Sequence, residues 1–470
     1  MAIIYFLQSD VIPTLLAAGV EVVLLIDDEI QERIAAQFAC PGLTVEGLRL
    51  KQANAYFQKV DNRRQWLLAY LRRVSGSWRI NNEAQTSHIW EVWAENSWKF
   101  RLGVWLPALF AMLVLRSSAM ARRALVRAQT RFTPNIYSDL FDKYQPDLVI
   151  ASTPGWRIDR YLLREAAQRG IPTMTVIVGW DNPSSYAIPG SRVDWATCWS
   201  QIQKDELVRA SDWPAERVNI GGIPSYDGYF RKSWLMPRDE YFRLHGLDLT
   251  RKLISYACSF VHFAPNYPNV EALAELVASD ELAQPSQLLV RLHPSHFQDK
   301  PRIFADEREA VYALEHKYPH VHVVRPVALG GSMGYYGGED MDEKSSMMAY
   351  SDVFVTVYST MVVETAVHAT PIVSACLDVP GGWNIPGKFS LSLRAIGNWP
   401  THKRFRDAKA GRVAYNQSQL CAALNAYLQN PQLDAAQRQA FVEREITFTD
   451  GTAGRRTAEF ILKVIENVGR

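Results

Sequence analysis

The chain has 470 residues, of which 48% are hydrophobic and 21% charged, and its formal net charge is +2. One hydrophobic core seldom serves a chain this long, so we expect two domains of about 200 residues each. The charge balance excludes an overall basic character and gives no indication of nucleic acid as a partner. The five cysteines are scattered and odd in number, which argues against a disulfide framework and favours a reducing cytoplasm.

The N-terminus, MAIIYFLQSD, lacks the basic region and the small-residue cleavage site of a secretory signal. We therefore expect a cytoplasmic protein.

Residues 60–135 form a basic and aromatic segment, rich in arginine and tryptophan and poor in acids. Its most apolar part, VWLPALFAMLVL at 104–115, is too short to cross a bilayer and contains Pro107. Two interpretations remain open. The segment is either a buried helical insertion with a solvated basic flank, or a peripheral contact with the inner face of the plasma membrane, as basic helices with Trp and Leu can make.

From residue 146 onward, short apolar runs alternate with stretches of helical character. Strands are predicted within PDLVIAS, IPTMTVIVGW, VDWATCWS and ERVNIGGIP, and helices within RIDRYLLREAAQRG and QIQKDELVRAS. The runs are continuously apolar and not alternating, which is typical of parallel strands covered on both faces by helices. This pattern predicts a doubly wound α/β domain.

A second series of the same kind follows a charged, aromatic stretch at 229–245. Its predicted strands are RKLISYACS, SQLLVRLHPS, HVHVVRPV, DVFVTVYST and TPIVSACLD, and its predicted helices are NVEALAELVASD, EREAVYALEHKY, DEKSSMMAYS and MVVETAVHA. We therefore predict an N-terminal domain over 1–228 and a C-terminal domain over 229–470, both Rossmann-like and facing a cleft. The amphipathic stretch AGRRTAEFILKVIENV predicts a C-terminal helix.

Ligands of doubly wound sheets lie beyond the carboxyl ends of the strands, where loops lead into helices. In VYSTMVVETAVHATPIV this rule selects Ser359 and Thr360, with Glu364 about one turn further on. Hydroxyls and free N–H groups at a helix start suit a phosphate, and Glu364 suits a sugar or ribose hydroxyl. An ordinary N-cap followed by a solvated glutamate explains the same residues.

Other strand ends of the second series also carry polar groups. His293 follows the predicted strand SQLLVR, Arg291 precedes it by two residues, and Ser259 follows RKLISYAC. His293 fits a donor to a diphosphate oxygen, although a single histidine at such a position is often structural. The glycine-rich GGSMGYYGGED does not match a dinucleotide fingerprint or a P-loop. No pattern of metal ligands is visible, so we expect neither a metal nor another cofactor.

Taken together, these motifs resemble the GT-B glycosyltransferase superfamily. The His-Pro strand end, DVFVTVYSTMVVETAVHATPIV and GWDNPSSYAIPGSRVDWATCWSQIQKDEL are similar to bacterial capsule and surface-polysaccharide transferases and to CDP-glycerol glycerophosphotransferases. The likeness covers most of the chain except 60–135. It implies a nucleotide-activated sugar as donor substrate and a surface glycan or lipid-linked molecule as acceptor.

The resemblance also implies roles for the candidate residues. Arg291, His293, Ser359, Thr360, Glu364 and Ser259 would bind the donor from the C-terminal domain, with His293 also acting in catalysis. The N-terminal domain would receive the acceptor. Asp181, in GWDN, is the candidate base that takes the acceptor hydroxyl proton in an inverting transfer. A cap on the following turn explains Asp181 equally well.

The start of the chain departs from the family pattern, in which a full strand and a glycine loop precede the first helix. Here only MAIIYF precedes QSDVIPTLLAAGVEVVLL, which is similar to the first helix and second strand. Either the first strand is abbreviated or translation begins upstream.

Three other functions fit the same residues. A CDP-glycerol-type enzyme would transfer a polyol phosphate. A UDP-N-acetylglucosamine 2-epimerase would need no acceptor, and the large 60–135 insertion argues against it. A non-catalytic subunit could keep the fold without activity.

Overall fold

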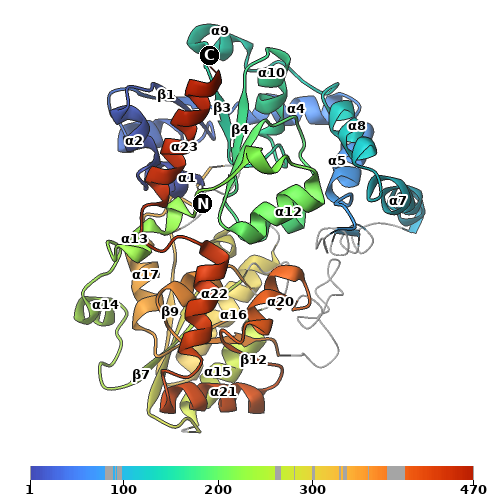
Figure 1. The fold of residues 1–470 in the computed structure, drawn as a ribbon. Helices are drawn as coiled ribbons and strands as arrows, with labels where there is room; N and C mark the ends of the chain where they lie inside the picture. Colours follow the sequence, from blue (N-terminus) through green and yellow to red (C-terminus); the bar gives the residue numbers. More distant parts are fainter. Residues whose placement is uncertain are drawn as a thin grey trace. The chain divides into compact units, whose positions relative to one another are not determined.

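The structure is a computed structural model. It describes residues 2–79, 88–89, 92, 98–259, 266–279, 281–298, 302–327, 330–331, 336–357, 359–377 and 397–468. The chain divides into two compact units, which are described separately (Figure 1). Unit 1 comprises Met1–Asp227, Gly331–Met333 and Ile446–Arg470, and unit 2 comprises Gly228–Gly330 and Gly334–Glu445.

Unit 1 is built on a parallel sheet of four strands in the order β3-β4-β5-β6, with β1 and β2 forming a separate parallel pair. All of β4 is buried, as expected of a strand covered on both faces, and its threonines Thr173 and Thr175 are as buried as Met174 and Val176. The strands are β1 (Val22–Ile26), β2 (Leu43–Gly47), β3 (Val149–Ala151), β4 (Thr173–Val176), β5 (Trp195–Cys198) and β6 (Val218–Ile220).

Helices of unit 1 lie at both sides of this sheet in Figure 1, with α2 and α23 on the left and α5, α7 and α8 on the right. The α-helices are α1 (Ala2–Leu7), α2 (Val11–Ala17), α3 (Gln31–Gln37), α4 (Leu50–Lys59), α5 (Asn62–Arg73), α7 (Trp98–Phe110), α8 (Ala119–Gln129), α9 (Ser138–Tyr144), α10 (Arg160–Gln168), α11 (Asn182–Tyr186), α12 (Gln201–Ser211) and α23 (Ala453–Val468). A π-helix, η1 (Ala111–Leu115), continues α7, and the short 3-10 helices are η2 (Ala215–Arg217) and η3 (Pro224–Tyr226).

Two findings in unit 1 differ from the sequence prediction. Residues 2–7 form α1 and not an abbreviated strand, and the Ser9 hydroxyl donates to the Tyr5 carbonyl just past its end. A short run of buried apolar residues fits a helix as well as a strand, so periodicity could not decide. The C-terminal helix α23, assigned by sequence to the second domain, belongs to unit 1. Ala458 and Ile461 join a core cluster with Val11 and Leu15 of α2.

Unit 2 has a six-stranded parallel sheet in the order β12-β11-β10-β7-β8-β9. The α/β class, with a parallel sheet at the centre of each unit, is therefore confirmed, and each strand predicted between residues 146 and 377 is present. The strands are β7 (Lys252–Ala257), β8 (Ser286–Arg291), β9 (Val321–Val324), β10 (Val353–Thr356), β11 (Ile372–Ala375) and β12 (Arg412–Ala414), of which β12 was not predicted.

The core of unit 2 lies between this sheet and the helices beside it, with Val270 and Leu273 of α15 and Leu420 and Leu424 of α21 packed against the strands. The helices are α14 (Arg238–Leu244), α15 (Tyr267–Ala278), η4 (Pro294–Phe297), α16 (Ile303–Lys317), α17 (Met341–Tyr350), α18 (Met361–Val367), α20 (Pro400–Asp407), α21 (Gln417–Gln429) and α22 (Ala435–Ile446), and α13 (Asp227–Phe230) lies at the boundary between the units.

Candidate functional site

The unit 2 sheet has a point at which its strand order reverses. From β7 the chain adds β8 and β9 on one side, and then returns to add β10, β11 and β12 on the other. In open α/β sheets ligands bind beyond the carboxyl edge at such a reversal, between the loops that leave the two strands flanking it, which here are β7 and β10. Ser259 follows β7, and Ser359 and Thr360 follow β10, so the structure places these three predicted residues at the reversal.

Ser259 is held in place by Asn266, which precedes α15. The Asn266 side-chain oxygen accepts from the Ser259 N–H at 2.8 Å and hydroxyl at 3.3 Å, and its amide donates to the Ser259 carbonyl at 3.1 Å. Asn266 is fully buried. Residues 260–265, which continue the loop after Ser259, lie outside the described residues.

A buried hydrogen-bond chain connects Ser259 with His293. The Asn266 amide donates to Glu307 of α16 at 3.1 Å, and the same carboxylate oxygen lies 2.9 Å from His296 Nε2. His296 Nδ1 in turn lies 3.1 Å from the His293 N–H. Glu307 and His296 are buried, so this chain fixes the loop after β8 relative to the loop after β7.

His293 is the N-cap residue of η4 and lies two residues beyond Arg291, the last residue of β8. Its Nδ1 accepts from the Ser295 N–H at 3.1 Å, which fixes the proton of the neutral ring on Nε2. Desolvation, followed by the charges of His296, Lys344 and Arg291, lowers the pKa of His293 to about 4. At neutral pH the imidazole is therefore an uncharged ring that carries its N–H on Nε2.

Ser359 and Thr360 lead into α18. Both are half-buried, and the Ser359 hydroxyl accepts from the Met361 N–H at 3.3 Å. Thr360 is the N-cap residue, but its hydroxyl makes no capping bond. The capping interpretation therefore describes Ser359 and leaves the Thr360 hydroxyl unused for the cap. Tyr358 lies outside the described residues.

Glu364 of α18 is buried and not solvated. Its Oε2 accepts from the Tyr229 hydroxyl at 2.6 Å and from Lys344 Nζ at 2.5 Å. Its Oε1 accepts no hydrogen bond in the part of the chain that the structure describes. One carboxylate oxygen is thus bound by protein groups, and the other remains available to a hydroxyl.

Arg291 ends β8 and is buried. Its guanidinium pairs with Asp340 and, at 2.9 Å, with Glu343 of α17. Burial alone would lower the pKa of Arg291, but Asp340, Tyr336 and Glu343 outweigh it and raise that pKa. The observed role of Arg291 is to join α17 to β8, because both carboxylates already neutralise its charge.

Lys344 is one of three residues of this site that sequence analysis missed. It connects the predicted groups, because it pairs with Glu364 and its charge also acts on His293. A cue existed in the sequence, since a lysine in the first turn of a helix opposes the helix dipole and needs a compensating acid. Asn266 and Glu307 were missed as well. Their partners are distant in sequence, and no local spacing marks them.

Asp181 belongs to unit 1 and follows β4. It is half-buried at the N-terminal end of α11, where its carboxylate accepts from the Ser185 hydroxyl at 2.8 Å and its carbonyl from the Ser185 N–H at 2.8 Å. Asp181 therefore does stabilise the turn into α11. Its second predicted role, as a base, remains a prediction.

Metal ligands do not cluster in the described ranges, where no group of three or more His, Cys, Asp or Glu residues could hold a metal ion. The glycine-rich loop predicted at 330–340 lies partly outside those ranges.

No protein-family model matches this chain, and no curated protein sequence matches it. Similar solved structures include the UDP-GlcNAc 2-epimerase of Neisseria meningitidis bound to UDP-GlcNAc, with a TM-score of 0.49 at 11% identity over 94% of this chain and 98% of that one. A glycosyltransferase of Rickettsia africae has a TM-score of 0.43 at 12% identity, covering 75% of this chain and 84% of that chain.

The wall teichoic acid polymerase TagF, with CDPG, has a TM-score of 0.34 at 14% identity and covers 59% of this chain and 60% of that chain. These proteins are members of the GT-B superfamily, the one that the sequence resembles. TM-scores below 0.5 at such identities transfer no ligand, substrate or activity from these proteins to this chain.

Proposed function

We propose that this chain is a glycosyltransferase of the GT-B superfamily that moves a sugar from a nucleotide-activated donor to a surface-glycan or lipid-linked acceptor. The observation that carries the proposal is the reversal of strand order in unit 2. Ser259, Ser359 and Thr360 follow the two strands that flank this reversal. A buried hydrogen-bond chain fixes His293, which follows the neighbouring strand β8.

These groups suit the diphosphate of a nucleotide sugar. A neutral imidazole with its proton on Nε2 donates a hydrogen bond without needing a counter-ion, and the hydroxyls and N–H groups after β10 are further donors. Glu364 Oε1 suits a ribose or sugar hydroxyl, and Lys344 suits a phosphate oxygen. Together they stabilise the negative charge that grows on the leaving nucleotide as the bond from the sugar C1 to the phosphate oxygen breaks.

Asp181 is the proposed base. As the acceptor oxygen forms its bond to C1, the acceptor hydroxyl proton passes to the Asp181 carboxylate, and the nucleoside diphosphate departs with the bonding electron pair. An Asp181→Asn variant should lower kcat strongly and leave the Kd for the donor unchanged, because the amide keeps the Ser185 contact but accepts no proton.

The test begins with the identity of the donor. Thermal unfolding should be measured with UDP, GDP, CMP, CDP and dTDP species, since a ligand that binds only the folded state raises its Tm. Transfer is then assayed with the sugar nucleotide that stabilises most. His293→Asn keeps an acceptor for the Ser295 N–H but loses the Nε2 donor, so turnover should fall by about 10²–10³. His293→Gln, whose amide nitrogen reaches the Nε2 position, should recover part of it.

Four outcomes would overturn or change the proposal. Full turnover in both His293→Asn and Ser359→Ala would remove the site assignment. Epimer formed from UDP-N-acetylglucosamine without any acceptor would replace the transferase with an isomerase. An absence of stabilisation by every nucleotide would favour a non-catalytic subunit. Stabilisation by CDP-glycerol with glycerol phosphate transfer would change the transferred group.

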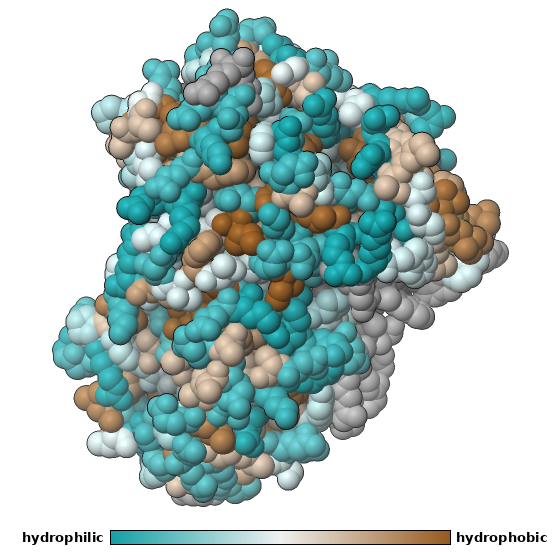
Figure 2. Space-filling view, viewed as in Figure 1, coloured by the Kyte–Doolittle hydropathy of each residue, from teal (hydrophilic) through white to brown (hydrophobic). Residues whose placement is uncertain are grey.

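We also propose that unit 1 meets its acceptor at an anionic membrane surface, through α7 and η1. This helical stretch buries Val104, Ala108, Ala111 and Leu115 against the insertion. Its other face exposes Trp105, Leu106, Leu109, Phe110, Leu113 and Val114. Figure 2 shows a brown patch at the right edge, where Figure 1 draws α7. A contiguous exposed apolar face of this size is typical of an interaction site, and basic residues beside it suit anionic lipids.

Membrane contact would be peripheral. Nothing in the described ranges forms a helix long and apolar enough to cross a bilayer. On the same insertion, Arg123 and Arg127 of α8 are exposed and available to lipid headgroups.

A further inference from the structure

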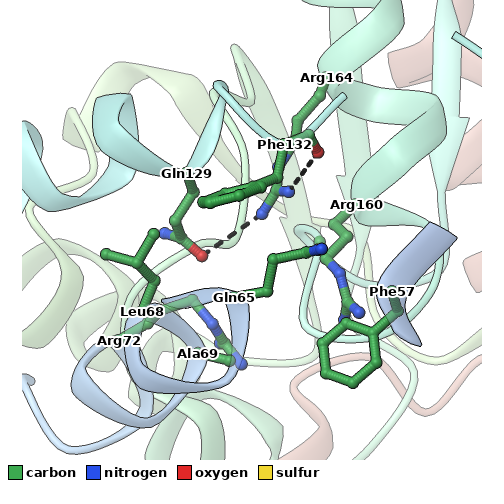
Figure 3. A pocket seen from close by; sticks show the side chains of 10 residues that line it. Phe57, Gln65, Leu68, Ala69, Arg72, Gln129, Phe132, Arg160 and Arg164 are labelled. Carbon is green, nitrogen blue, oxygen red and sulfur yellow. Dashed lines mark hydrogen bonds between the residues drawn. The ribbon is translucent and has the colours of Figure 1, made fainter. Parts of the chain in front are cut away.

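A pocket in unit 1 lies where the helices of the 60–135 insertion meet α10 (Figure 3). The lining comes from α4, α5, α8 and α10, with Phe132 and Gly155 from loops. Three arginines, Arg72, Arg160 and Arg164, line this pocket together with Gln65 and Gln129. We call it the arginine pocket. It contains none of the residues proposed above for donor binding or catalysis.

Arg72 of α5 and Arg164 of α10 are almost fully buried, at 5% and 3% exposure. Arg72 donates to the carbonyls of Tyr186 and Ile188, at 3.2 and 3.1 Å. Arg164 donates to the carbonyls of Gly190 and Phe132, at 2.7 and 2.9 Å, and to the Gln129 amide oxygen at 3.4 Å. Every partner is an uncharged oxygen.

Arg160 is half-buried at the first position of α10. It donates to the Arg157 carbonyl at 3.1 Å, and its guanidinium lies 4.8 Å from the centre of the Tyr161 ring and 5.5 Å from that of Phe57. Within the described part of the chain none of the three arginines forms an ion pair. Three guanidinium charges thus share one pocket without a carboxylate.

The neighbouring acids are occupied elsewhere. Asp159 accepts from the Thr153 N–H and hydroxyl, at 3.0 and 2.6 Å, and from the Arg157 N–H. Glu165 accepts from the Tyr137 N–H at 3.1 Å and the Ser138 hydroxyl at 2.7 Å. Asp159 attracts Arg160 only from beyond ion-pair distance, and Glu165 pairs with Arg169 instead.

Another buried arginine of unit 1, Arg122, has the carboxylate partner that Arg72 and Arg164 lack. Arg122 of α8 is as deeply buried, at 4%, and Asp212 neutralises it with two contacts of 2.6 and 2.7 Å. Burying a charge without a partner is costly, which is why proteins usually supply one. Desolvation first, and then repulsion by Arg160, lowers the pKa of both Arg72 and Arg164 to about 9.

We propose that the arginine pocket binds a phosphate or diphosphate group, whose charge completes the site. Guanidinium forks match phosphate oxygens in pairs, and several of them converge naturally on a dianion. Phe57, Leu68 and Phe132 in the lining provide apolar contact for an organic group attached to the phosphate. The proposal does not depend on the transfer reaction, since it concerns binding to unit 1 alone.

The experiment measures Tm and calorimetric Kd for inorganic phosphate and pyrophosphate at constant ionic strength, in the full chain and in Arg160→Gln. Arg160→Gln removes a repelling charge and spares the buried contacts of Arg72 and Arg164. Without anion its Tm should therefore equal or exceed that of the native chain, while its affinity for pyrophosphate should fall at least about tenfold. The control is Arg33→Gln, an exposed arginine of α3 in unit 1, which should change neither value.

A second measurement uses the native chain alone. Pyrophosphate should protect Arg160, but not Arg33, from modification by phenylglyoxal, as read by mass spectrometry. Vesicles that contain phosphatidic acid are compared with neutral vesicles, for the native chain and for Arg160→Gln. Binding that requires both phosphatidic acid and Arg160 indicates a lipid-borne phosphate, whereas Arg160-dependent binding of pyrophosphate alone indicates a soluble one. Stabilisation of the native chain and Arg160→Gln to the same extent would overturn the proposal. So would the absence of binding of phosphate, pyrophosphate and phosphatidic acid, or a lower Tm of Arg160→Gln with pyrophosphate affinity intact.

Discussion

At the scale of single residues, the candidate donor site depends on charges that are buried and paired before any ligand arrives. Lys344 and Glu364 have side-chain exposures of only 13% and 5%, and the Tyr229 hydroxyl shares the same carboxylate oxygen. Breaking such a pair leaves an uncompensated charge, whereas replacing both partners removes the problem. Single and double substitutions of Lys344 and Glu364 therefore distinguish the contribution of the pair to stability from its contribution to ligand binding.

We expect Lys344→Met to lower the free energy of unfolding of unit 2 by about 3–5 kcal/mol, because Glu364 remains buried without its cation. The double variant Lys344→Met/Glu364→Gln should recover most of this loss, since neither charge remains. Donor affinity should stay low in the double variant, because both ligand contacts are gone. Denaturant unfolding and nucleotide titration measure the two effects on the same samples.

The matched control is Lys252→Met. Lys252 pairs with Asp352 at 2.9 Å, but its side chain is 35% exposed, so the loss should be only about 0–1 kcal/mol. If Lys344→Met proved no more destabilising than Lys252→Met, the buried pair would not be a structural element of unit 2. If the double variant regained full donor affinity, neither residue would contact the ligand.

At the scale of elements, α7 and η1 combine two apolar faces on one helical stretch. A helix at the surface of a soluble protein normally turns a polar face outward. Here the buried positions recur every three or four residues, at 104, 108, 111 and 115, and the positions between them are also apolar. The inward face explains the packing of the insertion, but nothing in unit 1 covers the outward one in the described ranges.

We expect Leu106→Gln/Leu113→Gln to weaken binding to vesicles of anionic lipid at least about tenfold, because each leucine contributes more than 1 kcal/mol when it leaves water. The two side chains are 70% and 66% exposed, so Tm should not change. Co-sedimentation at low and high salt measures the binding, and salt should weaken it further.

The control for this pair is Leu244→Gln/Leu249→Gln in unit 2, where the side chains are 57% and 53% exposed and flank no comparable apolar face. It should bind vesicles as the native chain does. A native chain that stays in solution at low salt, or an equal loss in both double variants, would contradict a membrane-facing role of α7.

The elements also show what sequence can predict. Continuous apolar runs predict buried parallel strands such as β8 and β10. The rule that ligands bind beyond the carboxyl ends of such strands then selects the polar residues there, His293 and Ser359. By contrast, β12 has three residues with little apolar pattern. The Lys344 pairing and the arginine pocket depend on contacts between segments up to about a hundred residues apart, which no local pattern records.

At the scale of the whole molecule, the two units differ in the kind of titratable group that they bury. Nine of the ten histidines lie between Gly228 and Glu445, within the range of unit 2, and unit 1 contains only His88. Desolvation, with smaller effects of nearby charges, lowers the pKa of His245, His293 and His368 to about 4 and that of His402 to about 3. These rings are neutral in the fold at pH 5 but charged in an unfolded chain.

Unit 2 should therefore lose stability in acid before unit 1 does. Since each folded-state pKa lies below the ordinary value of about 6.5, the unfolded chain binds more protons between pH 6.5 and 4, and stability falls as pH falls through that window. Each buried histidine should cost about 1–2 kcal/mol at pH 5. Burial raises the pKa of Glu343, so this single carboxyl binds its proton more readily in the fold and offsets only part of the loss.

Scanning calorimetry at pH 7.5 and pH 5 measures the effect, with the lower pH expected to shift one transition strongly and the other little. His368→Gln identifies the transition, because it removes one of the buried rings, and the unit 2 transition should then become less sensitive to pH. The His368 Nε2 has no hydrogen-bond partner in the described part of the chain, so the substitution breaks no bond there. Equal shifts of both transitions, or a unit 2 transition unchanged at pH 5, would mean that the buried histidines do not control the acid stability of this fold.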